Sequence, residues 1–371
     1  MQTQQTSSGP RAWSQFDWPF FGTVLVICGV GLLTLYSSTY LNQITIFYKQ
    51  LVFLSGGLAL ALLVSLIDYR VFERLAYPVY FMVVALLIVV IIAGKKVYGS
   101  QRWLPVGPIH LQPSELAKIA IVLTLARFYS RERVPLLHGY GLRELIPVMG
   151  IVGVPVLLIF KQPDLGTAIM IGFVAFTIVF FCNLRMRTLL MIVLTIIVSV
   201  PVIYNFGLKD FQRNRVKTFL DPSRDPLEKG YQSLQSMITV GSGETVGKGY
   251  LKGTQSKLEF LPKHHTDFIF SSFAEEWGFL GCALLIGLFS ILVFLGIDIS
   301  RKSKDKFGSV LAMGALSIIV WHGIVNMAME IGLLPVVGVT FPFFSYGGSS
   351  LITNMLAVGI LLSISLRRHI F

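Results

Sequence analysis

A short polar segment just ahead of an apolar stretch carries residue types that suit acid–base chemistry. It reads His264-His265-Thr266-Asp267-Phe268-Ile269-Phe270. A carboxylate at the edge of a membrane is costly unless it has a partner or a function. In a partly dehydrated cleft such a carboxylate becomes a stronger base. We therefore expect Asp267 to act as a catalytic base and the adjacent His265 and Thr266 to contact its substrate.

A second motif places two opposite charges at the start of an apolar segment. It reads Gln112-Pro113-Ser114-Glu115-Leu116-Ala117-Lys118. Pro113 suits the first turn of a helix, and residues three apart, such as Glu115 and Lys118, share one helix face. An ion pair would reduce the cost of burying both charges. The pair either fixes helix packing or, as charges within membranes usually do, marks a substrate route. We expect it to bind substrate.

Two further polar motifs precede apolar segments. In Lys161-Gln162-Pro163-Asp164-Leu165-Gly166-Thr167, the Asp164 carboxylate suits the free N–H groups of the following helix. A capping aspartate can also line a cavity, so both roles stay open. In Ser345-Tyr346-Gly347-Gly348, the glycines allow an irregular backbone whose amides could face a cavity. The alternative is a re-entrant turn without ligand contact. We expect Asp164, Ser345, Gly347 and Gly348 to contribute to substrate binding.

One apolar segment carries a polar stripe. His322, Asn326 and Glu330 are spaced by four residues and therefore share a helix face. Such a stripe favours interhelical hydrogen bonds over metal binding.

The composition identifies the elements that must position these residues. The chain has 371 residues, of which 54% are hydrophobic and 13% charged, and a mean hydropathy of +0.71. Apolar runs of membrane-spanning length recur throughout, which predicts an all-α polytopic membrane protein with about ten transmembrane helices. The expected spans are Trp18–Leu35, Leu51–Ile67, Tyr77–Gly94, Pro113–Phe128, Leu145–Phe160, Leu165–Phe181, Leu189–Tyr204, Phe279–Ile297, Ser309–Leu333 and Leu351–Leu366.

The distribution of basic residues predicts the orientation. Basic residues such as Arg70, Arg131 and Arg301 follow every second span, and positive loops stay inside the cell. Both termini are therefore expected in the cytoplasm. Residues 1–15 are expected to form a flexible cytoplasmic tail and residues 16–371 a single transmembrane domain. Residues 205–266 would then be a large extracytoplasmic loop, and the motifs above would lie on the outer side.

The net charge of +12 raises the question of the partner. The basic residues lie mostly in loops rather than on a base-reading helix, which argues against nucleic acid. Basic residues predicted on the outer side, including Arg102, Arg213 and Arg215, indicate an anionic substrate head group.

The predicted outer loop also contains a glycine cluster that includes Gly243, Gly247 and Gly249. Such glycines allow turns and close approach of the backbone to a ligand. A flexible turn region is the alternative.

Taken together, the motifs resemble the SEDS family (shape, elongation, division and sporulation), the bacterial peptidoglycan polymerases. The resemblance extends from the first span to Arg368 and is closer to the rod-shape members than to the division members. Its most specific parts are Arg102-Trp103, Gln112-Pro113-Ser114-Glu115, Gln162-Pro163-Asp164-Leu165-Gly166, His265-Thr266-Asp267-Phe268-Ile269-Phe270 and Ser345-Tyr346-Gly347-Gly348-Ser349-Ser350.

The resemblance implies a glycosyltransferase of the bacterial cytoplasmic membrane with an outward-facing site. Its substrate would be lipid II, an undecaprenyl-pyrophosphate-linked disaccharide pentapeptide, polymerised into β-1,4 glycan strands during cell elongation. Asp267 matches the essential aspartate of the family, Glu115 and Lys118 match its salt-bridged pair, and Asp164 matches a further functional carboxylate. The expected transfer inverts the donor sugar and releases undecaprenyl pyrophosphate.

The resemblance also implies partners and leaves one rival function. The partners would be a class B penicillin-binding protein, which is a transpeptidase, and other proteins of the elongation complex. A divalent cation, Mg²⁺ or Mn²⁺, is allowed, with ligands that the sequence does not identify, and no nucleotide is needed. The rival is a lipid II flippase, because buried charges and broken helices also occur in transporters. Charges gathered at the outer ends of the spans favour the enzyme.

Overall fold

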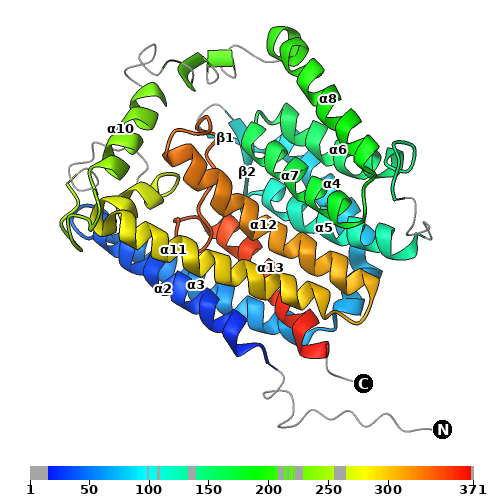
Figure 1. The fold of residues 1–371 in the computed structure, drawn as a ribbon, viewed down its shortest axis with the longest axis horizontal. Coiled ribbons are helices and arrows are strands. Elements are labelled where there is room, and N and C mark those ends of the chain that lie inside the picture. The colour runs from blue at the N-terminus through cyan, green and yellow to red at the C-terminus, as the bar shows by residue number, and fades with distance from the viewer. Residues whose placement is uncertain are drawn as a thin grey trace.

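The computed structural model describes residues 16–97, 100–106, 109–132, 139–207, 213–214, 217–219, 221, 229–254 and 265–368. The described chain is mostly helical (Figure 1). Its helices are α2 (Trp18–Thr39), α3 (Ile44–Leu66), α4 (Tyr69–Ala93), α5 (Pro113–Arg131), α6 (Ile146–Lys161), α7 (Leu165–Phe181), α8 (Met186–Val202), the π-helix η1 (Ile203–Gly207), α10 (Lys229–Gly241), α11 (Ile269–Arg301), α12 (Lys306–Glu330) and α13 (Gly348–Arg367).

The helices have the length and composition of a membrane protein. Within the described ranges, six helices are long and apolar enough to cross a bilayer: α2, α3, α4, α11, α12 and α13. Shorter apolar helices are α6, α7 and the part of α8 at Met186–Ser199. A polytopic membrane protein is therefore confirmed in its coarse form. The count of ten spans and their orientation stay predictions.

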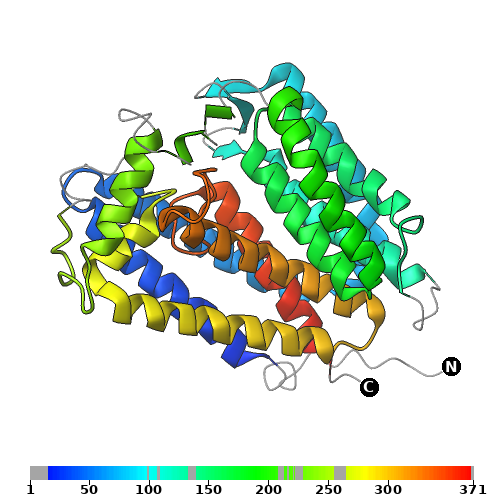
Figure 2. The ribbon, with the colours of Figure 1, turned by 45° about the horizontal axis from the view of Figure 1, so that its top comes forward.

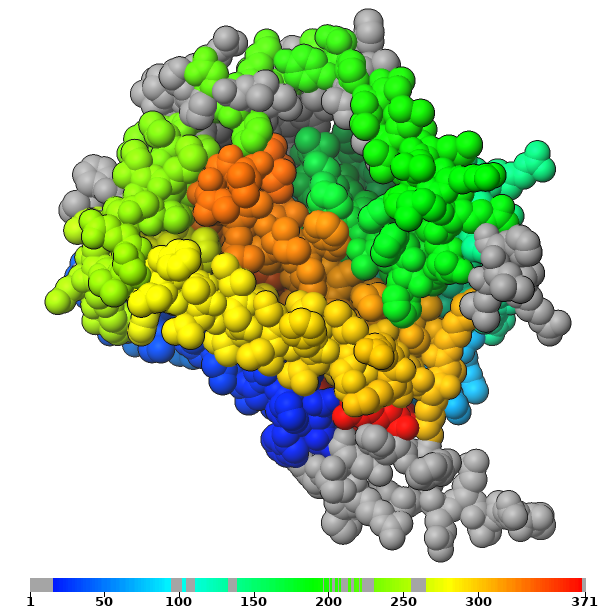
Figure 3. Space-filling model, in the orientation of Figure 1, coloured from blue at the N-terminus to red at the C-terminus, as the bar shows by residue number. Residues whose placement is uncertain are grey.

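The core of the bundle forms around α12 and α13. Their most apolar windows are 72% and 78% buried, whereas the window of α4 is 28% buried. α12 packs against α5, α7, α11 and α13 (Figures 1 and 2). In the space-filling view the surface is hollowed between α8 and the segment that follows α12 (Figure 3).

Polar contacts close one end of the bundle. Asp17, just before α2, accepts a hydrogen bond from Ser365 at 3.1 Å and lies 3.3 Å from Arg368 at the end of α13. Tyr69, at the start of α4, donates to Asp305 before α12 at 2.8 Å. We call this the proximal end. The distal end is the opposite one, where α5, α7, α11 and α13 begin.

A small antiparallel sheet, which the sequence did not predict, connects α4 to α5 in an otherwise nearly all-helical chain. Its strands are β1 (Lys95–Val97), β2 (Ser100–Val106) and β3 (Ile109–Leu111), in the order β1-β2-β3. The segment contains Val97, Trp103, Val106 and Ile109, residue types that favour strands. β2 positions Arg102 at the distal end.

The glycine cluster lies in turns, one of the alternatives that the sequence left open, and these turns pack against α11. A Cβ atom at Gly243 would collide with the Ala274 carbonyl, and one at Gly247 with the Glu276 carbonyl. Both carbonyls belong to α11, which breaks locally at Gly278 (φ 62°). The backbone that these glycines approach is therefore that of α11 rather than a ligand.

Candidate active site

Asp267 lies in the turn just before α11, and backbone contacts fix that turn. The His265 carbonyl accepts a hydrogen bond from the Tyr346 N–H at 2.9 Å. The Asn326 side-chain amide donates to the carbonyl of Asp267 at 2.9 Å and to that of Val339 at 2.8 Å. α12 thus joins the Asp267 turn to the chain that precedes α13. The Asp267 side chain is half-buried.

The segment between α12 and α13 passes close to the Asp267 carboxylate. Gly338 has φ +75°, a conformation that favours glycine, and a Cβ placed there would lie 3.5 Å from Asp267 Oδ2. The preceding Val337 carbonyl lies 2.7 Å from the position of a Cβ at Gly166, in the first turn of α7. The chain at Val337 and Gly338 therefore packs against both the start of α7 and the Asp267 carboxylate.

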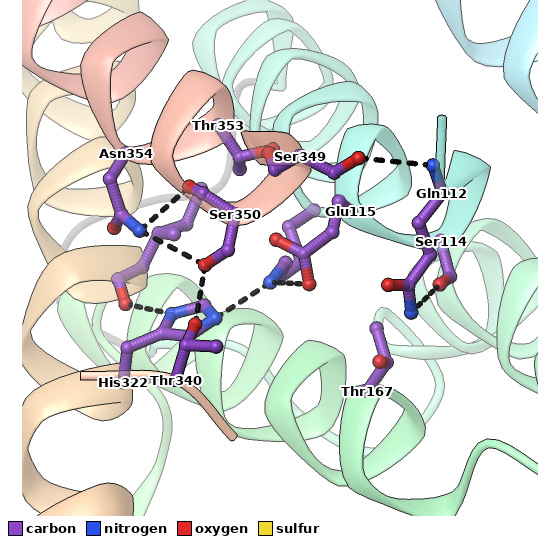
Figure 4. A network of polar contacts seen from close by, with 12 residues as sticks. Gln112, Ser114, Glu115, Thr167, His322, Thr340, Ser349, Ser350, Thr353 and Asn354 are labelled. Carbon is purple, nitrogen blue, oxygen red and sulfur yellow. Dashed lines mark hydrogen bonds and ion pairs between the residues drawn. The ribbon is translucent and has the colours of Figure 1, made fainter. Parts of the chain in front are cut away.

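The predicted Glu115–Lys118 ion pair is present in the first turns of α5 (Figure 4). Lys118 Nζ lies 2.7 Å from Glu115 Oε1 and 2.7 Å from His322 Nε2 on α12. His322 Nδ1 lies 2.7 Å from the Ile318 carbonyl, which can only accept a hydrogen bond. Nδ1 therefore carries the proton, and Nε2 accepts from the Lys118 ammonium.

Two buried polar atoms near these charges lack a hydrogen-bond partner among the described residues. They are Glu115 Oε2 and Arg102 Nε. Buried polar groups are normally paired, and an unpaired one carries a desolvation cost. A bound ligand with hydroxyl and anionic groups would satisfy both atoms.

Asp164 has the capping role, one of the two that the sequence left open, and its carboxylate makes further polar contacts. It caps α7 by accepting from Thr167 N at 3.4 Å, and it also accepts from Thr167 Oγ1 at 3.0 Å. Its carboxylate further accepts from Gln112 Nε2 at 2.9 Å and lies 3.4 Å from Arg102 Nη1. Asp164 is 3% exposed, so this cluster joins β2, α5 and α7 in the protein interior. The sequence motif contained Gln112 but gave no reason to assign it this contact.

The Ser345-Tyr346-Gly347-Gly348 motif forms the turn before α13. Ser345 Oγ accepts from Phe341 N at 2.8 Å, so this hydroxyl stabilises its own turn. Gly348 lies against Phe53, whose ring would be 3.2 Å from an added Cβ. The Tyr346 ring centroid lies 6.3 Å from that of His265, and burial raises the pKa of the Tyr346 phenol. The motif therefore lies beside the Asp267 turn.

The remaining predicted residues are less closely connected. Thr266 is half-buried in the same turn as Asp267. Arg213 donates from Nε to the Tyr204 carbonyl at 2.9 Å, which connects it to the start of η1. No described contact joins Arg213 to Asp267. Arg215 and His264 lie outside the described residues.

A divalent cation was allowed by the resemblance, and its fit can be tested against the side chains present. The described residues contain no group of three or more His, Cys, Asp or Glu side chains arranged to hold a metal ion. A cation held by one or two carboxylates and by substrate phosphates would not need such a group, so the divalent cation stays a prediction and no step is assigned to it.

Comparison with known proteins places this chain in one family. The family FtsW/RodA/SpoVE, described as cell cycle protein, matches residues 16–370. The peptidoglycan glycosyltransferase MrdB of Escherichia coli strain K12 is 41% identical over 313 residues, 84% of this chain and 83% of that protein. A probable peptidoglycan glycosyltransferase FtsW of Trichlorobacter lovleyi is 36% identical, with 96% of this chain and 94% of that protein covered.

Two solved structures are also similar. One is a chain from a peptidoglycan synthase complex that coordinates polymerization and crosslinking, with a TM-score of 0.83, 31% identity, and 96% and 99% of the two chains covered. The other is the rod shape determining protein RodA of Thermus thermophilus, with a TM-score of 0.72, 27% identity, and 96% and 99% covered. The present chain belongs to the FtsW/RodA/SpoVE family, as the sequence motifs predicted.

Proposed function

We propose that this protein polymerises lipid II into β-1,4 glycan strands for cell elongation. It is a peptidoglycan glycosyltransferase, the activity for which its relatives are named. The rod-shape assignment is supported by the 41% identity to MrdB, which is a RodA protein, against 36% to the FtsW relative. The observation that carries the site assignment is the position of Asp267, beside Gly338 in a turn held by α12 and by the segment that precedes α13.

In the proposed reaction Asp267 takes the proton from the C4 hydroxyl of the acceptor sugar. The C4 oxygen then attacks C1 of the donor sugar from the face opposite the pyrophosphate, so that the donor is inverted. The C1–O bond to undecaprenyl pyrophosphate breaks, and its electron pair leaves with the phosphate. The pyrophosphate link already activates the donor, so one carboxylate base is enough, unlike the two-carboxylate glycosidase scheme.

Negative charge that develops on the leaving pyrophosphate requires fixed cations nearby. Arg102 and Lys118 are the described candidates, because one has an unpaired Nε and the other lies almost fully buried at the start of α5. Asp164 and Glu115 hold these cations in place through contacts of 3.4 Å and 2.7 Å. Their positions are thus fixed before substrate arrives, which is the condition for electrostatic stabilisation.

The proposed setting is the bacterial cytoplasmic membrane, with the distal end facing outward. The positive-inside distribution of Arg and Lys supports this orientation. A class B penicillin-binding protein is the proposed partner. Its support is the similarity to a chain from a complex that couples polymerization to crosslinking.

The experiment uses the purified protein in detergent with lipid II as the substrate. Because no membrane is present to cross, a flippase would yield no product there, whereas a polymerase makes glycan strands. We expect Asp267→Asn to lower the polymerisation rate about 10³-fold, within the range for loss of a general base. The variant should keep the wild-type melting temperature. Strand synthesis by folded Asp267→Asn at the wild-type rate would overturn the assignment.

A further inference from the structure

Glu330 is a buried carboxylate that the proposed chemistry does not use. It is the last residue of α12 and is 0% exposed. A carboxylate at the C-terminal end of a helix opposes the helix dipole. Its Oε1 atom has no hydrogen-bond partner among the described residues. Each of these three features, which are the burial, the unpaired oxygen and the position at the helix end, raises the free energy of the folded protein. A strong compensating interaction is therefore required.

The compensation comes from the first turn of α11. Glu330 Oε2 accepts a hydrogen bond from Ser271 N at 2.5 Å and from Ser271 Oγ at 2.6 Å. Ser271 is the third residue of α11, the position whose N–H is normally bonded by the N-cap side chain. The N-cap residue of α11 is Phe268, which makes no such bond. Glu330 therefore caps α11 in place of a local residue.

This cap lies immediately next to the proposed base. Asp267 is four positions before Ser271 in the sequence, and α12 contacts both residues. Asn326 holds the Asp267 carbonyl at 2.9 Å, and Glu330 holds the amide of Ser271. If the first turn of α11 loosened, the turn that carries Asp267 would keep its contacts with Asn326 and Tyr346 but would no longer lead into a fixed helix.

The contacts around Glu330 and Ser271 extend to α10, the helix that precedes the glycine cluster. Ser236 of α10 lies with its Oγ 2.7 Å from Ser271 Oγ and donates to the Glu330 carbonyl at 2.8 Å. Ser236 and Ser271 are both 0% exposed. A displacement of α10 would thus also disturb the first turn of α11.

We propose that Glu330 is a positioning residue for Asp267, acting as the N-terminal cap of α11 from a neighbouring helix. This inference rests on the proposed role of Asp267. It concerns hydrogen-bond acceptance rather than charge. An amide at position 330 should therefore preserve the function, and an apolar side chain should not.

The test compares Glu330→Leu and Glu330→Gln in lipid II polymerisation by the purified full chain. We expect Glu330→Leu to lower kcat about 10²-fold at an unchanged KM, because small displacements of a reacting group carry penalties of that order. Glu330→Gln should stay within about threefold of wild type, since its carbonyl can accept from Ser271 N–H. Hydrogen exchange of the amides at Ile269–Ser271 should be faster in Glu330→Leu only.

Thr177→Val is the matched control. It removes the bond from Trp321 Nε1 to Thr177 Oγ1, 2.8 Å long, which also joins α12 to another helix but lies outside the proposed site. It should leave kcat unchanged. If Glu330→Leu does not fold, Ser271→Ala replaces it, with an expected drop in kcat of about fivefold at unchanged KM.

Two outcomes would overturn the inference. The first is wild-type kcat in folded Glu330→Leu, or in Ser271→Ala where that variant replaces it. The second is an equal loss in Glu330→Leu and Glu330→Gln, which would assign the role to the charge. Failure of the proposed function is distinguishable, because the wild-type protein would then make no glycan strands, and failure of the base assignment would appear as normal polymerisation by Asp267→Asn.

Discussion

Two glutamate–lysine pairs at the distal end have nearly the same geometry and different surroundings. Lys118 and Glu115 are 2.7 Å apart, and Lys248 and Glu275 are 2.6 Å apart. Glu275 Oε1 also accepts from the N–H and hydroxyl of Thr254, so it closes the loop after α10 onto α11. Glu115 instead keeps Oε2 without a partner among the described residues.

The comparison shows that burial of an ion pair does not by itself indicate a functional site. Glu115 is 8% exposed and Glu275 is 0% exposed. It is the fully buried Glu275 whose contacts hold a loop against a helix. The two ion pairs differ in the residues that surround them. The Lys118 pair adjoins His322 and the Asp164 cluster, and it leaves hydrogen-bonding capacity for a ligand. The Lys248 pair belongs to a loop packed on α11.

Lys118→Met should have the largest effect on activity among changes that test this comparison. We expect kcat to fall about 10²-fold, as when a preorganised donor is removed from a developing anion. The single change also leaves Glu115 buried without its cation, which destabilises the fold. The double variant Glu115→Gln/Lys118→Met should therefore recover the melting temperature but not the polymerisation rate. Recovery of both would show that this pair is structural too.

Arg102→Ala should have a smaller effect, mainly on substrate binding. Arg102 is half-buried and pairs with Asp164 at 3.4 Å. Loss of one charge-assisted contact to the pyrophosphate should raise KM for lipid II about tenfold. Initial rates measured over a range of lipid II concentrations separate KM from kcat. An unchanged KM would remove Arg102 from the binding site.

Lys248→Met should have the smallest effect on activity and a clear effect on stability. Removing the cation leaves Glu275 buried, and we expect a loss of about 2 kcal/mol, reduced from the fully buried case because Lys248 is partly exposed. The melting temperature in detergent should fall while kcat of the folded protein stays within about twofold. Lys248→Met/Glu275→Gln should restore stability. A large loss of kcat would place this pair in the site.

Local sequence patterns predicted much of the helical fold. The helix Leu165–Phe181 was predicted with the bounds that the structure shows. The Glu115–Lys118 contact followed from helix periodicity alone. The start of α11 was placed at Phe279, ten residues after its observed start at Ile269. The polar side chains in between, such as Glu275, resembled a loop because their partners come from distant segments.

Contacts between distant segments account for what the sequence did not predict. The capping of α11 by Glu330 joins residues 59 positions apart, and no local pattern encodes it. The bond from Gln112 to Asp164 spans 52 positions. The sheet between α4 and α5 was missed because its strands are short and interrupted by glycine and proline in the sequence.

The central claim is that Asp267 removes a proton from the acceptor sugar. A solved structure with a lipid-linked sugar in the acceptor position tests it most directly, through the distance from the Asp267 carboxylate to the C4 oxygen. We predict a separation of about 2.6–3.2 Å, the hydrogen-bonding reach of a general base. A sugar bound with its C4 oxygen beside another acidic side chain, and with Asp267 remote from it, would contradict the account.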